Sequence, residues 1–248
     1  MTTKPLLALL VLTAPALAHD HDPAVTQPGA VLSPADASKT PAFDILASHA
    51  HRSGDQVTFH MTLAGDAGAE RPAPVGDLKA APVWSYVWPT SLDPATVGFE
   101  TKSGILALAA TIHPDFDDTP LYDETGDGDA ANDGDVWHSH WVVLTPNDEC
   151  GPGALSVRDI PEGEKPSLPA TWPGLPLFID SPDYKPSFDG PEISLTVDLP
   201  ASVGTEIAYD GVTSALRVNA NLHAPLLCVT DVWDVASGDL SLPGKVAE

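Results

Sequence analysis

Short runs of alternating apolar and polar residues recur along this chain, and residues two apart share one face of an extended strand. Val57, Phe59, Met61 and Leu63 alternate with polar neighbours, which predicts a strand with one buried face. Residues 105–112 are apolar at nearly every position, which predicts a strand buried on both faces.

Similar runs, separated by turns rich in proline and glycine, give the other strands that we expect. They lie at residues 43–51, 56–64, 83–88, 105–112, 141–144, 175–179, 193–199, 214–223 and 226–233. No long amphipathic helical pattern accompanies them. The predicted fold class is all-β: an antiparallel β-sandwich with long Pro/Gly-rich loops, in which residues 141–144 pair with residues 105–112.

The first 18 residues have the pattern of a secretory signal peptide. Lys4 supplies a positive start, residues 6–12 are apolar, and Ala16-Leu17-Ala18 is a small-residue cleavage site. We expect residues 19–42 to form an extended N-terminal arm and residues 43–248 to form a single β-sandwich domain. No later run is long and apolar enough for a membrane helix, so we expect a periplasmic or secreted protein without membrane insertion.

The formal net charge of −24 arises from 35 acidic and 11 basic side chains. Such a surface repels nucleic acid and anionic lipid and attracts cations. Acid-rich chains are often disordered, but a 43% share of hydrophobic residues and six tryptophans predict a folded core here. The charge therefore excludes nucleic acid as a partner and favours a metal ion.

Two cysteines, Cys150 and Cys228, are present. In an exported protein the default is a disulfide between them, closing a loop of nearly 80 residues. The alternative is a thiolate metal site, which is disfavoured because neither cysteine has a close cysteine or histidine at ligand spacing.

Three histidines and several carboxylates gather within residues 111–144. His138 and His140 are two apart, so a strand would point both toward one ion. His113, Asp115 and Asp117 have the same spacing at the end of the apolar run. We predict that the three histidines, with Asp115 or Asp117, bind a divalent metal, with Zn²⁺ or Cu²⁺ best suited to imidazole. The alternative is that the histidines form hydrogen bonds with carboxylates at a strand rim.

An acidic, glycine-rich loop lies between the two histidine segments. Its alternating carboxylates can wrap Ca²⁺, although the spacing of an EF-hand is absent. The residues that would bind calcium are Asp127, Asp129, Asn132, Asp133 and Asp135. The alternative is an ordinary loop in which these side chains accept backbone N–H groups.

Cleavage after Ala18 would leave His19-Asp20-His21 at the new N-terminus. The α-amine, two backbone amides and the imidazole of His21 form a square-planar nitrogen set, which selects Cu²⁺ or Ni²⁺, and His19 adds a second chelate. In this single residue, His19, the chain resembles copper-dependent polysaccharide monooxygenases and some periplasmic copper carriers, which are β-sandwiches beginning with histidine. The resemblance implies a terminal copper site.

Two further groups of side chains have structural and functional interpretations. With a two- or four-residue turn after His51, that residue lies opposite Gln56, and His49, His51 and His60 share the face away from the core. A solvated strand face is the preferred interpretation. Trp84, Tyr86 and Trp88 share another face, and packing inside the protein is preferred over stacking on a sugar.

These observations favour an exported metal-binding protein that carries, buffers or senses a divalent transition metal. The alternative is a metal-dependent enzyme, a hydrolase or copper oxidase, using the same histidine and aspartate site with an aspartate of residues 115–118 as base. A weaker alternative is a carbohydrate-binding β-sandwich that uses the aromatic stripe.

Overall fold

A computed structural model describes residues 27–130, 132–219 and 225–248 of the chain. Almost all of its regular structure is β-strand, connected by antiparallel pairing. The strands are β1 (Val31–Leu32), β2 (Ile45–Ser53), β3 (Gln56–Leu63), β4 (Pro82–Pro89), β5 (Ile105–Ile112), β6 (His138–Pro146), β7 (Leu155–Val157), β8 (Ile179–Asp180), β9 (Ser187–Asp189), β10 (Glu192–Asp198), β11 (Ala208–Tyr209), β12 (Val212–Val218), β13 (Leu227–Val235) and β14 (Gly244–Lys245).

Five short 3₁₀ helices complete the regular elements of the described residues. They are η1 (Pro41–Phe43), η2 (Pro94–Val97), η3 (Asp133–Asp135), η4 (Asp148–Cys150) and η5 (Ala201–Val203). The all-β, antiparallel, sandwich-like class predicted from the alternating pattern is therefore confirmed.

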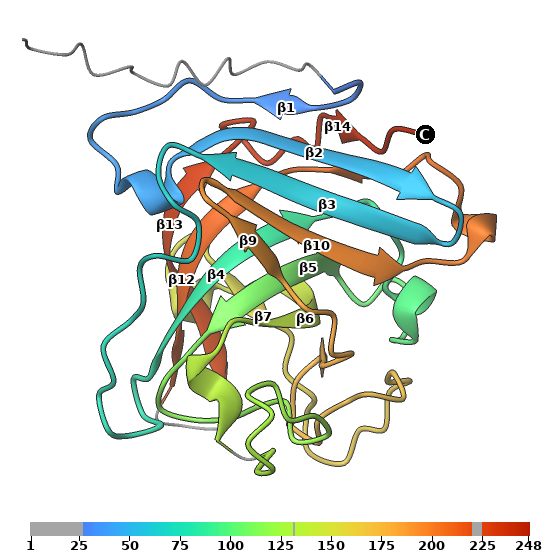
Figure 1. The fold of residues 1–248 in the computed structure, drawn as a ribbon. Coiled ribbons are helices and arrows are strands. Elements are labelled where there is room, and N and C mark those ends of the chain that lie inside the picture. Colours follow the sequence, from blue (N-terminus) through green and yellow to red (C-terminus); the bar gives the residue numbers. More distant parts are fainter. Residues whose placement is uncertain (1–26, 131, 220–224) are drawn as a thin grey trace, which may run out of the picture.

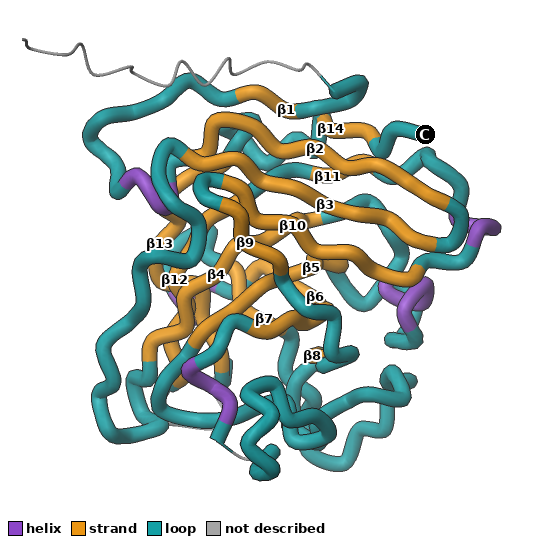
Figure 2. The backbone as a smooth tube through the Cα atoms, viewed as in Figure 1, coloured by secondary structure: helices purple, strands orange, loops and turns teal. Residues whose placement is uncertain are grey.

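The strands form two layers, of which one is an open sheet and the other a closed barrel. The open sheet has the order β1-β2-β3-β10-β9 and lies across the barrel in Figures 1 and 2. The second sheet has the order β5-β4-β12-β13-β7-β6-β8, and β5 also pairs with β6. That last pairing closes six of its strands into a barrel, which the sequence pattern did not predict.

Closure of the barrel depends on the predicted partnership of the apolar run with the segment after the histidines. β5 and β6 pair antiparallel from Ile105 opposite Leu144 to Thr111 opposite His138. Both ends of this ladder lie at barrel rims, so the histidines sit at one rim and Ile105 at the other.

Two separate hydrophobic cores result from the two faces of the barrel wall. Even-numbered residues of β4 and β5, such as Trp88 and Leu108, pack between the barrel and the open sheet. Odd-numbered residues of the same strands, such as Val87 and Ala109, point into the barrel and form the second core. The prediction that residues 105–112 are buried on both faces is explained by this arrangement, because each face meets a different core.

The aromatic stripe belongs to the first core. Tyr86 and Trp88 are fully buried, and Trp84 packs at the edge of the same cluster against Phe43 and Trp233. Tyr86 and Trp88 therefore offer no stacking surface for a sugar, and of the residues on which the carbohydrate-binding alternative depended only Trp84 is partly exposed.

The hairpin of β2 and β3 has a two-residue turn at Gly54–Asp55. His51 pairs with Thr58, not with Gln56 as predicted, and His49 pairs with His60. Because the shift is two residues, the three histidines still share one face. The His49 and His60 rings stack at 4.3 Å, and the Nδ1 atom of His60 lies 3.0 Å from the Glu192 carboxylate.

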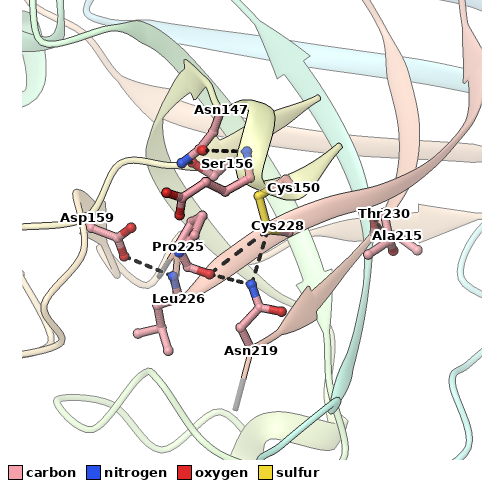
Figure 3. Close-up of a disulfide and its surroundings, with 11 residues drawn as sticks. Asn147, Cys150, Ser156, Asp159, Ala215, Asn219, Pro225, Leu226, Cys228 and Thr230 are labelled. Carbon is pink, nitrogen blue, oxygen red and sulfur yellow. Dashed lines mark hydrogen bonds between the residues drawn. A yellow bond between two sulfur atoms is a disulfide. The ribbon is translucent and has the colours of Figure 1, made fainter. Parts of the chain in front are cut away.

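The predicted disulfide joins η4 to β13, with the Cα atoms of Cys150 and Cys228 separated by 5.5 Å (Figure 3). The side-chain amide of Asn219 donates hydrogen bonds to the Cys228 sulfur and to the carbonyl of Pro225. The bond ties the loop between β6 and β7 to β13, the strand that pairs with β7 on the same side of the barrel wall. It also points to an oxidising, exported environment.

The predicted signal peptide and residues 19–26 of the predicted N-terminal arm, which include His19 and His21, lie outside the described residues. Within the described part of the chain, no helix has the length and apolarity needed to cross a membrane.

The histidine pair on the open sheet predicts a pH dependence of stability. Burial, followed by the charge of His60, lowers the pKa of His49 from 6.5 to about 4. The folded state therefore resists protonation of His49, and stability present above pH 6.5 falls as the pH drops toward 4. Because His49 is partly solvated, we expect about 1–2 kcal/mol of this loss to disappear in His49→Gln.

The measurement is urea unfolding of wild type and variant between pH 7.5 and 4. The same change at the more exposed His51 should remove less of the pH dependence. Parallel stability curves for wild type and His49→Gln across this range would contradict the prediction.

The disulfide predicts a large stabilisation, because it closes a loop spanning 78 residues. In the chain-entropy model such a loop is worth about 4 kcal/mol. The double variant Cys150→Ser, Cys228→Ser should therefore unfold at lower urea concentration than the oxidised wild type. Reductant should shift the wild-type midpoint and leave the variant unchanged, and an unshifted wild type would count against the bond.

Candidate metal centre

Three histidines and one aspartate converge inside the barrel at the end where β5 finishes. The Nε2 atoms of His113, His138 and His140 lie 3.1, 3.2 and 3.2 Å from the Oδ1 atom of Asp118. The Nε2 atoms of His113 and His138 are 3.0 Å apart. One ligand atom from each of the four residues lies within 4.8 Å of all the others. Among the described residues, this is the one group with metal-binding spacing.

The strand geometry explains how the histidines meet. His138 and His140 occupy alternate positions of β6 that point into the barrel, as their spacing predicted. His113 directly follows β5, and its backbone N–H donates to the carbonyl of Gly134. A side chain at Gly134 would collide with the Phe116 carbonyl oxygen, so glycine allows the loop before β6 to pack against this turn.

Each imidazole is oriented by a hydrogen bond at its Nδ1 atom. The partners are the Phe116 carbonyl for His113, at 2.9 Å, and the Val136 carbonyl for His138, at 2.7 Å. A carbonyl only accepts, so both Nδ1 atoms carry the proton.

The third imidazole has the same tautomer for a related reason. The Nδ1 atom of His140 lies 3.2 Å from the Asp180 carbonyl and 3.1 Å from the Ser181 hydroxyl oxygen. That hydroxyl donates its own proton to the Asp118 carbonyl, so toward His140 it can only accept. In their neutral form, all three imidazoles therefore direct an Nε2 lone pair toward the centre.

With neutral imidazoles, this arrangement brings together acceptor atoms that cannot donate a hydrogen bond to one another. The Asp118 carboxylate adds a fourth acceptor, and the buried Nε2 atom of His140 makes no hydrogen bond to the protein. The Thr111 hydroxyl, 3.1 Å from the Nε2 atom of His138, can supply a proton to only one of these atoms. Three protonated imidazoles around one carboxylate would instead bury a net charge of +2, at several kcal/mol per uncompensated ion. A divalent cation satisfies all four atoms at once.

The spacing of these atoms suits a small transition-metal ion. Four ligands about 2.0 Å from a tetrahedral ion lie about 3.3 Å from one another. Four of the distances among the ligand atoms measure 3.0–3.2 Å. The residues present therefore fit a group of three imidazoles and one carboxylate around Zn²⁺ or a similar ion.

The electrostatics keep the aspartate in the form that binds metal. Burial alone would raise the pKa of Asp118, but whenever the imidazoles are protonated, the charges of His140 and His113 and hydrogen bonds from His113 and His138 hold its pKa well below its usual range. Asp118 is 6% exposed, and the three histidines are 1–2% exposed. The carboxylate is therefore ionised and shielded from solvent.

The carboxylate in this group differs from the ones that the sequence predicted. Asp115 accepts the backbone N–H groups of Val75 and Gly76, and Asp117 accepts those of Thr119 and Asp133. The alternation of β5 ends at Ile112, because the chain turns after His113. Spacing by two therefore no longer sets direction beyond that point, and Asp118 takes the central place.

The acidic loop after this turn uses its carboxylates as hydrogen-bond acceptors. Asp133 accepts the N–H groups of Glu124 and Thr125, and Asp127 accepts those of Asp129 and the Asn132 side chain. These contacts match the interpretation of an ordinary loop. The calcium site stays a prediction.

The comparisons with known proteins found no match. No protein-family model, no curated protein and no solved structure matches the chain, so its function is argued from the site alone.

Proposed function

We propose that this chain is an exported metalloprotein that holds one divalent transition-metal ion at the histidine end of its barrel. The ligands are the Nε2 atoms of His113, His138 and His140 and a carboxylate oxygen of Asp118. The observation that carries the proposal is the convergence of four buried acceptor atoms that, with neutral imidazoles, share a single nearby donor among the described residues, the Thr111 hydroxyl.

Zn²⁺ is the ion that best suits this set, with Cu²⁺ as the second candidate. Cu²⁺ prefers a tetragonal arrangement, whereas Zn²⁺ accepts a compact tetrahedral one. The near-equal distances from Asp118 to the three nitrogens favour the compact geometry.

The burial of the ligands favours a resident ion over a rapidly exchanged one. A carrier, buffer or sensor must release its ion, whereas the four ligand residues here are only 1–6% exposed. A second candidate function, a metal-dependent enzyme, is supported by a specific observation: Asp118 and His140 line an internal cavity of about 180 Å³. A catalytic ion needs a coordination position that substrate can reach, which here would be a fifth position beside the four protein ligands, on the side of the cavity.

The proposal predicts the metal content of the exported protein. Wild type should bind one equivalent of Zn²⁺, and His140→Ala or Asp118→Asn should weaken binding by at least about 100-fold, because each removes a direct ligand. Asp115→Asn is the matched control, because its carboxylate binds backbone N–H groups away from the centre. Elemental analysis and competition with a chelating dye measure both quantities. Equal affinity in wild type and Asp118→Asn would refute the site.

A second prediction separates a metal site from a simple hydrogen-bonded cluster. In metal-free protein at pH 8, Asp118→Asn places an N–H donor among the imidazole acceptors, so it should stabilise the fold. A gain of about 1 kcal/mol raises Tm by about 2–4 °C in a protein of this size. With Zn²⁺ present, the order should reverse, because only wild type gains from binding.

Calorimetry with and without a chelator measures the Tm of wild type and variant in the two conditions. If Asp118 served only as a partner for protonated histidines, the asparagine variant would melt lower than wild type in both conditions. That result would favour the strand-rim alternative.

A further inference from the structure

The interior of the barrel encloses a chamber that the metal ligands do not fill. Its volume is about 180 Å³, and its walls are side chains of β4, β5, β6, β7, β12 and β13 that point inward. Asp118 and His140 form part of its lining, so the chamber ends at the metal centre. An engineered cavity of about 150 Å³ lined by apolar groups stays dry and binds benzene.

Polar groups along the chamber wall are already satisfied by the protein. The hydroxyl of Ser85 pairs with Ser214 at 2.8 Å, and the hydroxyl of Thr90 donates to the Leu106 carbonyl at 2.9 Å. The remaining wall is dominated by valine, leucine, isoleucine and alanine. Unsatisfied polar atoms of the lining occur at the metal end, where His140 Nε2 has no hydrogen-bond partner. A matching occupant is apolar along its length and polar at one tip.

The end of the chamber away from the metal has an apolar rim that solvent reaches. Ile105, Val232 and Leu240 line the chamber and are 39%, 52% and 40% exposed. Leu240 and Leu242, in the segment between β13 and β14, both adopt positive φ, at 58° and 54°. Side chains rarely accept this backbone, and such strain gathers at ligand clamps. The rim offers a route by which an apolar molecule enters.

The charge at the metal end of the chamber determines which polar group the occupant carries. Three neutral imidazoles and one carboxylate around a divalent ion leave a net charge of +1 in a buried place. An anionic oxygen or sulfur bound to the ion would neutralise that charge, whereas a neutral group would leave it.

We propose that the barrel chamber binds a small aromatic molecule, about the size of a substituted benzene, with one weakly acidic group such as a phenol that meets the metal. The aromatic body lies against the wall of β4, β5 and β12, and the acidic group lies beside Asp118 and His140. The acidic contact rests on the proposed function; the fit of the body depends on the chamber alone.

Binding of the aromatic part of the occupant is tested with toluene, which has no atom able to bind metal. Metal-free wild type should bind one toluene by calorimetric titration. Ala109→Leu, which extends a side chain into the chamber, should weaken binding at least tenfold. Ala95→Leu makes the same change on the exposed surface of η2 and should bind as wild type does.

A second variant guards against misfolding of Ala109→Leu. Val87 pairs with Ala109 across β4 and β5 and also lines the chamber. Val87→Ala enlarges the same part of the chamber, so it should shift preference from toluene to propylbenzene. Absence of toluene binding in wild type, or equal binding in wild type and a folded Ala109→Leu, overturns the proposal.

The acidic contact is tested in protein loaded with Co²⁺, whose visible absorption reports its ligands. Addition of 4-methylphenol should change the spectrum, toluene should leave it unchanged, and Ala109→Leu should abolish the response. A spectrum unaffected by 4-methylphenol overturns the acidic contact. If Co²⁺ does not bind at all, the proposed function fails, and the toluene measurement still decides the chamber.

Discussion

The pairing of β5 with β6 is the interaction on which the rest of this molecule depends. It closes the barrel, and its register places His138 opposite Thr111 and His140 opposite Ala109. A shift of this ladder by one residue would turn both histidines toward the sandwich core and expel Trp141 from it. Closure, core packing and assembly of the candidate metal centre are therefore consequences of one register.

Buried polar groups usually pair a donor with an acceptor, and the candidate metal centre departs from this preference. Three imidazoles are held by Nδ1 contacts in the one tautomer that leaves their acceptor atoms facing Asp118. The barrel wall and the disulfide between η4 and β13 hold the surrounding structure in place while these acceptors crowd together. Rigid support of this kind preorganises the site, because folding brings the acceptor atoms together before any ion binds.

The sequence predicted the features that depend on strand periodicity and the pairing of the two cysteines. His138 and His140 on one face, the partnership of residues 105–112 with residues 141–144, and the disulfide all follow from local spacing or from elimination. Asp118 could not be found in this way, because it lies beyond a turn where alternation no longer fixes direction. Barrel closure and the chamber were also beyond reach, since alternation shows that a face is buried and does not show against what.

The two cores give each wall strand two independent roles. On β4, Trp84, Tyr86 and Trp88 serve the contact with the open sheet, whereas Val83, Ser85 and Val87 serve the chamber. Substitutions at the second set change the interior shape without disturbing the sandwich that supports it. The scaffold can therefore evolve toward new ligands one strand face at a time, and proteins that share it should differ at the chamber positions while keeping the alternate ones.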